Sequence, residues 1–251
     1  MFTYYLGSDG NCYVKHNNDY YKVEPIIWRV LNKDYATTGK ALLLAEKILT
    51  GGIPYYVNTS RRTIGNATVY PNNYKYSTIR AWLNGLDVVK SDSDSENDST
   101  YKDKGFLQTA FTTSAQNLIE ETTVDNSKES TFGRGETGGD NPYVCTNTED
   151  KIFLLSAQEA TTEEYGFGEH SAKGQGNTRI RVTTGYAEAT GAYQDSTTGY
   201  GGWWWLRSPY DSGKNHACSI DFDGNAFNID RVEDGDGGIV PALCVSASAI
   251  K

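Results

Sequence analysis

The hydrophobic pattern is strongest in a run of three consecutive tryptophans, Trp203, Trp204 and Trp205. Each ring must bury roughly 150–250 Å² of surface or leave it as an exposed patch. Strand alternation sends Trp203 and Trp205 to one face and Trp204 to the other. Arg207 then lies on the side of Trp203 and Trp205, where its guanidinium can stack on a ring or hold a carbonyl or carboxylate. The pattern predicts a buried strand with one face in a core and the other bracing a surface; a ligand contact by one ring is the alternative.

The positions after the tryptophans alternate between strand-like and turn-like segments, as in a β-meander. Residues 217–222 and 226–232 have the composition of strands, and Gly224 in the turn between them permits a positive φ. The last strand is expected at 239–245, where Pro241 requires an edge position, the start of the strand or a bulge. Together with the tryptophan strand, these segments are predicted to form one compact four-stranded sheet.

A helical pattern follows Ser77, which is a plausible N-cap. Ile79, Trp82 and Leu83 fall at positions i, i+3 and i+4, so they form one apolar face. Gly85 marks the expected end of this helix. Trp82 is therefore predicted to be a structural residue.

Two earlier apolar runs, 26–31 and 42–48, have the length of strands, and Trp28 in the first is expected to be a structural residue. The spacing of Ser or Thr and Gln or Glu at 113–116 and 156–159 is that of a capping box, which predicts two further helix starts. The second of these follows directly after another short apolar strand.

The 251 residues are enough for one large domain, which buries roughly 70–75% of its unfolded surface. We expect a single domain over 1–251 with a short N-terminal extension at 1–19. Three polar stretches are expected to be loop insertions, because segments with few hydrophobic residues do not repay their ordering entropy by burial. These stretches are 87–105, 120–149 and 161–201.

The formal net charge of −9 would repel a nucleic-acid backbone, so no nucleic-acid partner is expected. No apolar run reaches the ~18 residues of a transmembrane helix. The first residues lack the basic start and apolar core of a signal peptide, so the protein is either cytoplasmic or has lost a leader. The abundance of tyrosine and asparagine favours a cell-surface or secreted protein.

Three segments resemble a bacterial family of domains of unknown function: WWWLRSP (203–209), ACSIDFDGNAF (217–227) and GGIVPALCVS (237–246). Val240 stands where the family usually has an arginine, which removes any salt bridge built on that position. The resemblance implies an α+β domain of C-type-lectin-like fold, with small mixed or antiparallel sheets, two or three short helices and long polar loops. Formylglycine-generating enzymes and the variable proteins of diversity-generating retroelements share that fold. The resemblance also implies a binding surface on the last strands and their loops.

The common catalytic motifs are absent: there is no G-x-S-x-G elbow, no phosphate-binding glycine loop and no H-E-x-x-H. His16, His170 and His216 are the only histidines, and none has a nucleophile beside it in the sequence. The formylglycine-generating branch needs a closely spaced cysteine pair for copper, and Cys218 and Cys244 do not match that motif. We therefore expect no enzymatic activity and no catalytic residues.

The four cysteines are widely spaced and have no histidines at metal-ligand spacing: Cys12, Cys145, Cys218 and Cys244. A disulfide between Cys218 and Cys244 and four small buried thiols are both open interpretations.

Acidic stretches provide the candidate cation sites. Residues 221–225 resemble the start of a calcium loop but lack the later glutamate, so a hairpin turn is the preferred interpretation. The acidic stretches at 91–100 and 230–236 are expected to be solvated, with calcium binding as the alternative. We predict no metal site and no cofactor.

The interval from 210 to 231 interleaves apolar strand positions with side chains suited to recognition, because tyrosine and asparagine supply contact area or adaptable hydrogen bonds at modest entropic cost. The candidate ligand-binding residues are Tyr210, Asp211, Lys214, Asn215, His216, Asp221, Asn225, Asn228, Asp230 and Arg231. If these positions were targets of adenine-directed mutagenesis, Asn, Tyr, Asp, Ser and His would be expected there, as in the variable protein of a diversity-generating retroelement. We expect a non-catalytic ligand-binding or display domain whose partner is a protein or a glycan. The alternatives are an enzyme of the formylglycine-generating type and a structural module of a larger envelope protein.

Overall fold

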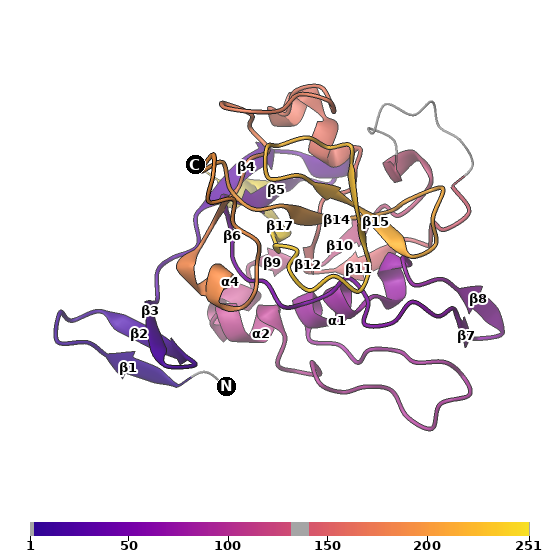
Figure 1. Cartoon of the computed structure of the whole chain (residues 1–251), viewed down its shortest axis with the longest axis horizontal. Helices are drawn as coiled ribbons and strands as arrows, with labels where there is room; N and C mark the ends of the chain where they lie inside the picture. Colours follow the sequence, from indigo (N-terminus) through magenta and orange to yellow (C-terminus); the bar gives the residue numbers. More distant parts are fainter. Residues whose placement is uncertain (1–2, 132–140, 251) are drawn as a thin grey trace.

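The computed structural model describes residues 3–131 and 141–250. The fold is a mixed α/β arrangement of small, mostly antiparallel sheets with a few short helices, as expected for the α+β class. Figure 1 shows a main body from which a small N-terminal sheet projects. Within these residues, no helix is both long enough and apolar enough to cross a membrane.

The projecting sheet contains three antiparallel strands in the order β1-β2-β3. Their bounds are β1 Tyr4–Leu6, β2 Cys12–His16 and β3 Asp19–Lys22. Asn17 has φ of 53°, a left-handed conformation that asparagine tolerates in a tight hairpin turn. The described part of the segment expected as an extension, residues 3–19, therefore contains β1, β2 and the start of β3, and the sheet ends at Lys22.

The core of the body is a five-stranded sheet. Its path is β12 (Ile152–Phe153), β17 (Ala242–Ser246), β5 (Lys40–Ala45) and β4 (Trp28–Asn32), and β9 (Ile119–Glu120) also pairs with β17. Residues 41–45 are buried on both faces of β5, which explains why this run reads as continuously apolar rather than alternating.

A separate three-stranded sheet is built from β14 (Trp204–Pro209), β15 (His216–Ile220) and β16 (Asn228–Arg231). The predicted meander is present up to β16, and Gly224 has the expected positive φ of 87°. The prediction that the last strand joins this sheet is wrong. Ala242, Leu243 and Cys244 are all buried, so β17 fits the centre of the larger sheet, and Pro241 lies directly before it.

The first helix has the predicted ends. In α1 (Thr78–Asn84) the Ser77 hydroxyl accepts the N–H of Arg80 at 3.1 Å, and Gly85 closes the helix at φ of 68°. Ile79 and Leu83 are fully buried, and Trp82 is half-buried against the same core.

The two capping-box predictions have different outcomes. Ser156 and Glu159 form the reciprocal pair: the hydroxyl accepts the Glu159 N–H at 3.1 Å, and the carboxylate accepts the Ser156 N–H at 2.8 Å. The element that follows is a 3₁₀ turn, Glu159–Thr161, and not an α-helix. The other prediction is wrong by one residue, because Thr112 and not Thr113 caps the short helix α3 (Thr113–Gln116).

The remaining elements are short. The helices are α2 (Phe106–Ala110) and α4 (Gly185–Ala189), and the paired strands are β6 (Lys47–Ile48) with β13 (Val182–Thr183), β7 (Arg62–Ile64) with β8 (Ala67–Val69), and β10 (Thr122–Val124) with β11 (Thr148–Asp150). The other 3₁₀ turns are Tyr35–Thr37, Tyr74–Tyr76, Glu129–Thr131, Glu163–Tyr165 and Ala247–Ala249.

The expected loop insertions differ from one another. The stretch 87–105 is an exposed loop closed by a bridge between Val88 and Asp98. The described part of 120–149 contains β10 and the first two residues of β11. The stretch 161–201 is not a surface decoration: it contains β13 and α4, and Arg179 and Arg181 within it are 0% and 1% exposed. The composition of the stretch does not reveal this burial, because the guanidinium groups of Arg179 and Arg181 donate to backbone carbonyls.

Candidate functional site

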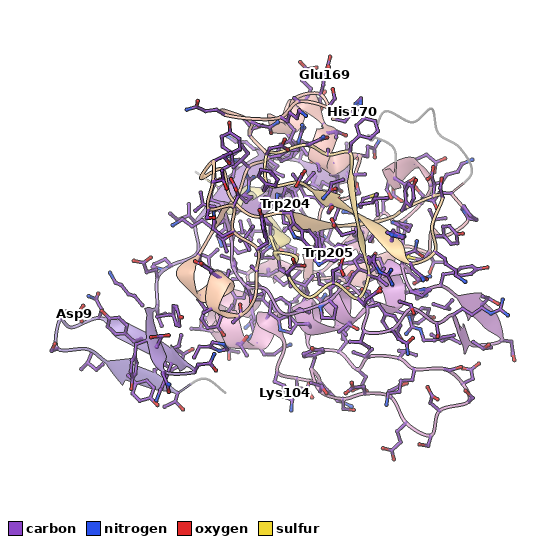
Figure 2. All side chains as sticks on the ribbon, in the orientation of Figure 1. Asp9, Lys104, Glu169, His170, Trp204 and Trp205 are labelled. Atoms are coloured by element: carbon purple, nitrogen blue, oxygen red, sulfur yellow. The ribbon has the colours of Figure 1, made fainter. Side chains whose placement is uncertain are left out.

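The tryptophan strand is buried on both faces. Trp203 and Trp205 lie on the same side, with ring centroids 4.8 Å apart at 76°. On the other side, the Trp204 indole N–H donates to the Arg179 carbonyl at 3.1 Å, and the Arg181 guanidinium lies 6.0 Å from the ring. The predicted alternation is confirmed, but no ring faces solvent, because both sides are covered by other segments. Trp204 and Trp205 lie well inside the body in Figure 2.

Arg207 is the buried ionic anchor of β14. Its guanidinium donates to the Leu154 carbonyl at 2.7 Å, to the Asp125 carbonyl at 2.9 Å and to both oxygens of Glu159. The Tyr35 hydroxyl also donates to Glu159, at 2.5 Å. Burial alone would raise the pKa of Glu159, but the charge and hydrogen bonds of Arg207 outweigh it and hold that pKa below its ordinary value. The expected contact of Arg207 with carbonyls and a carboxylate is confirmed.

None of the ten candidate residues is buried: Lys214 and Arg231 are exposed, and the others are half-buried. We call these ten residues, from Tyr210 to Arg231, the hairpin surface. At one end, the loop 210–215 joins β14 to β15, and His216 pairs in register with Arg231. This loop is held by Asn72, a fully buried residue that sequence reasoning missed, whose amide donates to the carbonyls of Gly213 and His216 at 3.2 and 3.0 Å.

The other end of the hairpin surface is partly covered. The Gly174 N–H donates to the Asp223 carbonyl at 2.8 Å, and the His170 and Phe227 rings lie 4.6 Å apart. The Arg179 guanidinium holds the Gly224 carbonyl at 2.7 Å from below. Asp221 and Asn225 therefore lie beside an overlying segment, whereas the end formed by the loop 210–215 and Arg231 is the more accessible.

Asp230 lies between these two ends. Its carboxylate accepts the Ser219 hydroxyl at 2.5 Å and the Asn228 amide at 3.0 Å. Burial, followed by the negative charges of Asp234 and Asp221, raises the pKa of Asp230 to about 6, although the Ser219 hydrogen bond opposes the shift. The folded protein therefore binds a proton here more readily than the unfolded chain.

Because the folded pKa of Asp230 is raised, the folded state should lose stability as the pH rises from about 4 through about 6. We expect a loss of roughly 1–2 kcal/mol, reduced from the full shift because the side chain is partly solvated. Asp230→Asn should remove this pH dependence. Urea unfolding of both proteins at pH 4.5 and 7.5, with an NMR titration of the carboxyl, measures it. A carboxyl that titrates near its ordinary value would contradict the expectation.

The described residues contain no group of three or more histidine, cysteine, aspartate or glutamate side chains placed to hold a metal. In the segment considered as a calcium loop, Asp221 and Asp223 accept backbone N–H groups of the turn at 2.8 and 3.0 Å. The three histidines contact three different aromatic partners in separate parts of the fold.

The cysteines of the described chain are all free thiols. Cys218 and Cys244 belong to different sheets and do not form a disulfide. Burial raises the pKa of Cys244 to about 11 and also raises the pKa of Cys145, which disfavours the reactive thiolate at both positions.

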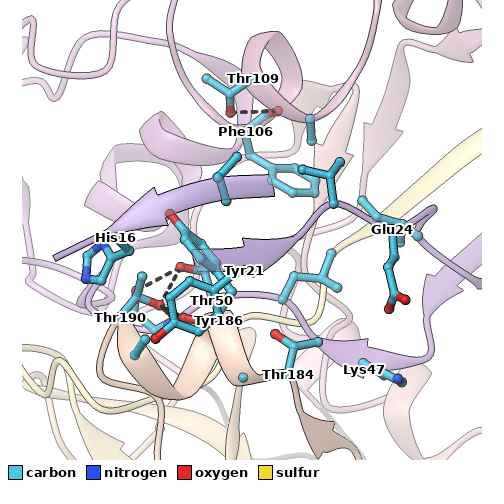
Figure 3. A pocket seen from close by; sticks show the side chains of 18 of the residues that line it. His16, Tyr21, Glu24, Lys47, Thr50, Phe106, Thr109, Thr184, Tyr186 and Thr190 are labelled. Atoms are coloured by element: carbon cyan, nitrogen blue, oxygen red, sulfur yellow. Dashed lines mark hydrogen bonds between the residues drawn. The ribbon is translucent and has the colours of Figure 1, made fainter. Parts of the chain in front are cut away.

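A large groove was missed by sequence reasoning. Its volume is about 1470 Å³, and it lies between the projecting sheet and the body, next to α2 and α4. Figure 3 shows Tyr21, His16 and Tyr186 on one side of it and Phe106 on the other. The lining comes from five distant parts of the sequence, so no local motif could have revealed it.

The structure is thus a mixed α/β domain in which buried side chains hold the sheet β14–β15–β16 beneath the hairpin surface. The family model described as a domain of unknown function (DUF6273) matches residues 38–247. The chain belongs to this family, which confirms the resemblance to an uncharacterised domain family. The match begins after β1–β3 and β4. Neither the curated proteins nor the solved structures contain a match.

Proposed function

We propose that this chain is a non-catalytic ligand-binding or display domain that contacts a protein or glycan partner through the hairpin surface. The observation that supports this most strongly is the combination of a rigid backing and accessible polar side chains. Three buried tryptophans and the Arg207–Glu159 pair fix β14, and Asn72 fixes the loop 210–215. A pre-organised surface loses less entropy on binding than a mobile one.

The accessible end of the hairpin surface sets the chemistry of the contact. Tyr210 and His216 lie with ring centroids 6.3 Å apart, and they supply aromatic area. Lys214 supplies exposed positive charge in a chain of net charge −9, and the exposed Arg231 donates to Glu233 at 2.7 Å. The Arg231–Glu233 pair places both signs of charge at this end, so it suits a partner that presents both donors and acceptors.

The proposal includes a C-type-lectin-like architecture and a location on the cell surface or outside the cell. The architecture rests on the sequence resemblance, and the location rests on the abundance of tyrosine and asparagine. The proposal also includes diversification of the hairpin surface, which the gene neighbourhood tests. A reverse transcriptase gene beside a near-copy of the segment encoding residues 210–231 would make this the variable protein of a diversity-generating retroelement. The lack of both would make it a static binding protein.

The charge-reversed variant Lys214→Glu/Arg231→Glu tests the surface directly. Binding to a glycan array and to a library of extracellular proteins should weaken at least about tenfold, which corresponds to about 1.4 kcal/mol. The matched control Lys33→Glu/Arg61→Glu changes the same charge at two other exposed positions and should bind like the wild type.

Three results would overturn the proposal. If the binders retain full affinity for Lys214→Glu/Arg231→Glu, the binding site lies elsewhere on the protein. Arrays without any binder would favour a structural module. A reactive, copper-sensitive cysteine with turnover would favour the enzymatic branch.

A further inference from the structure

We propose that the groove between the N-terminal sheet and the body binds an extended peptide segment of a partner protein, one that carries apolar and acidic side chains. This surface is separate from the hairpin surface and does not depend on it. Three independent features support it: the aromatic lining, the unpaired positive charge and a free strand edge.

The lining of the groove leaves large apolar side chains in contact with water. Tyr4, Tyr20 and Ile27 are 55%, 52% and 66% exposed. Deeper in the groove, the half-buried Trp28 stacks on Phe111 with centroids 6.2 Å apart. A contiguous apolar lining of this kind is typical of a binding site, because covering it removes apolar area from water.

The charge of the groove is positive in a protein that is negative as a whole. The two glutamates of the lining are already paired, Glu46 with Arg29 at 2.8 Å and Glu24 with Lys22 at 3.4 Å. Lys47 and Lys104 also line the groove, are exposed, and form no ion pair with any residue in 3–131 or 141–250. The uncompensated charge therefore favours a ligand with carboxylates.

The backbone of β3 favours a peptide over an acidic carbohydrate. This strand lines the groove with Tyr20, Tyr21 and Lys22, and within the described chain it pairs only with β2. The Val23 N–H donates to the Cys12 carbonyl on β2 at 2.8 Å. Because hydrogen-bonding direction alternates along an antiparallel strand, Tyr20 and Lys22 turn their N–H and C=O groups to the free edge.

A free edge of this kind accepts an additional strand, whose backbone bonds to the edge while its side chains enter neighbouring pockets. The α4 residue Tyr186 contacts the rings of His16 and Tyr21 at 5.8 and 5.7 Å, which holds the sheet beside the body. A peptide added to β3 would therefore have one wall for backbone pairing and the opposite wall, with Phe106 and Phe111, for its apolar side chains.

Selection from a random twelve-residue peptide display library on the full chain tests the proposal. Enriched peptides should combine apolar residues with two or more acidic residues and lack proline at their centre. In fluorescence polarisation, Lys47→Glu/Lys104→Glu should weaken the best peptide at least about tenfold. Lys33→Glu/Arg61→Glu and Lys214→Glu/Arg231→Glu should leave it unchanged, which separates this surface from the hairpin surface. N-methylation of one set of alternate peptide amides, the set that faces β3, should abolish binding, whereas N-methylation of the other set should leave it largely intact.

The proposal fails if the library yields no enrichment or basic peptides. It also fails if Lys47→Glu/Lys104→Glu binds as the wild type does, or if both peptides, each N-methylated on one set of alternate amides, retain affinity. A competition experiment compares a sulfated oligosaccharide with unlabelled peptide as displacers of the labelled peptide. If the oligosaccharide displaces the peptide at the lower concentration, the groove is a site for an acidic carbohydrate.

Discussion

Replacing Arg207 with methionine is expected to lower the free energy of unfolding by about 3–5 kcal/mol, because the change leaves a buried carboxylate without its counter-charge. Arg207 is 1% exposed, and its guanidinium reaches both oxygens of Glu159 and two backbone carbonyls. Methionine fills a similar volume, so the loss reports on charge and hydrogen bonding more than on packing. Urea unfolding at pH 7 measures it.

The same pair has a defined pH dependence. The pKa of Glu159 is held below its ordinary value in the folded state, so its contribution to stability is present above the unfolded pKa of about 4.3 and is lost as the pH falls. In Arg207→Met, burial without the counter-charge raises the pKa of Glu159, so the variant regains stability as the pH falls from 7. The difference in stability between the wild type and Arg207→Met should therefore shrink as the pH falls from 7 and continue to shrink below about pH 4.

One companion variant completes this test. The double variant Arg207→Met/Glu159→Gln should recover part of the loss, because it leaves no buried charge. Equal stability of the wild type and Arg207→Met at pH 7 would show that this ion pair does not anchor β14.

Trp204→Ala is expected to cost a similar amount, about 3–5 kcal/mol, by opening a cavity in a closely packed region. Trp204 is 0% exposed, and its indole N–H bonds to the carbonyl of the equally buried Arg179. Trp204→Phe keeps most of the ring area and should cost less. Both are measured by urea unfolding.

The matched control is Tyr20→Ala, which truncates an aromatic side chain that is 52% exposed and should change stability by less than about 1 kcal/mol. A loss at Trp204 no larger than at Tyr20 would mean that the body does not pack around the tryptophan strand.

Local patterns in the sequence predicted local structure well. Alternation placed Trp203 and Trp205 on one side of a strand, and the cap at Ser77 and the turn at Gly224 are where residue chemistry requires them. These features depend on neighbours a few positions away. Strand partners depend on the whole fold, which is why β17 was assigned to the wrong sheet.

The misassigned insertion at 161–201 has a different cause. Arg179 and Arg181 are buried because their guanidinium groups bond to backbone carbonyls, and composition alone marks them as surface residues. The groove was missed because its walls come together only in three dimensions. Of the candidate site, the residues of the accessible end could be named from sequence, whereas Asn72 beneath them carried no signal.

The central claim is that a rigid C-terminal sheet supports an accessible polar surface, and hydrogen exchange with mass spectrometry tests it most directly. Backbone amides of β14 and β15 should exchange only through opening events close in free energy to global unfolding. The amides of the loop 210–215 should exchange faster than those of the strands, and the amides of the strand residues next to the loop should stay protected. Fast exchange throughout residues 204–220, at the rate of the exposed loop 91–100, would contradict the claim.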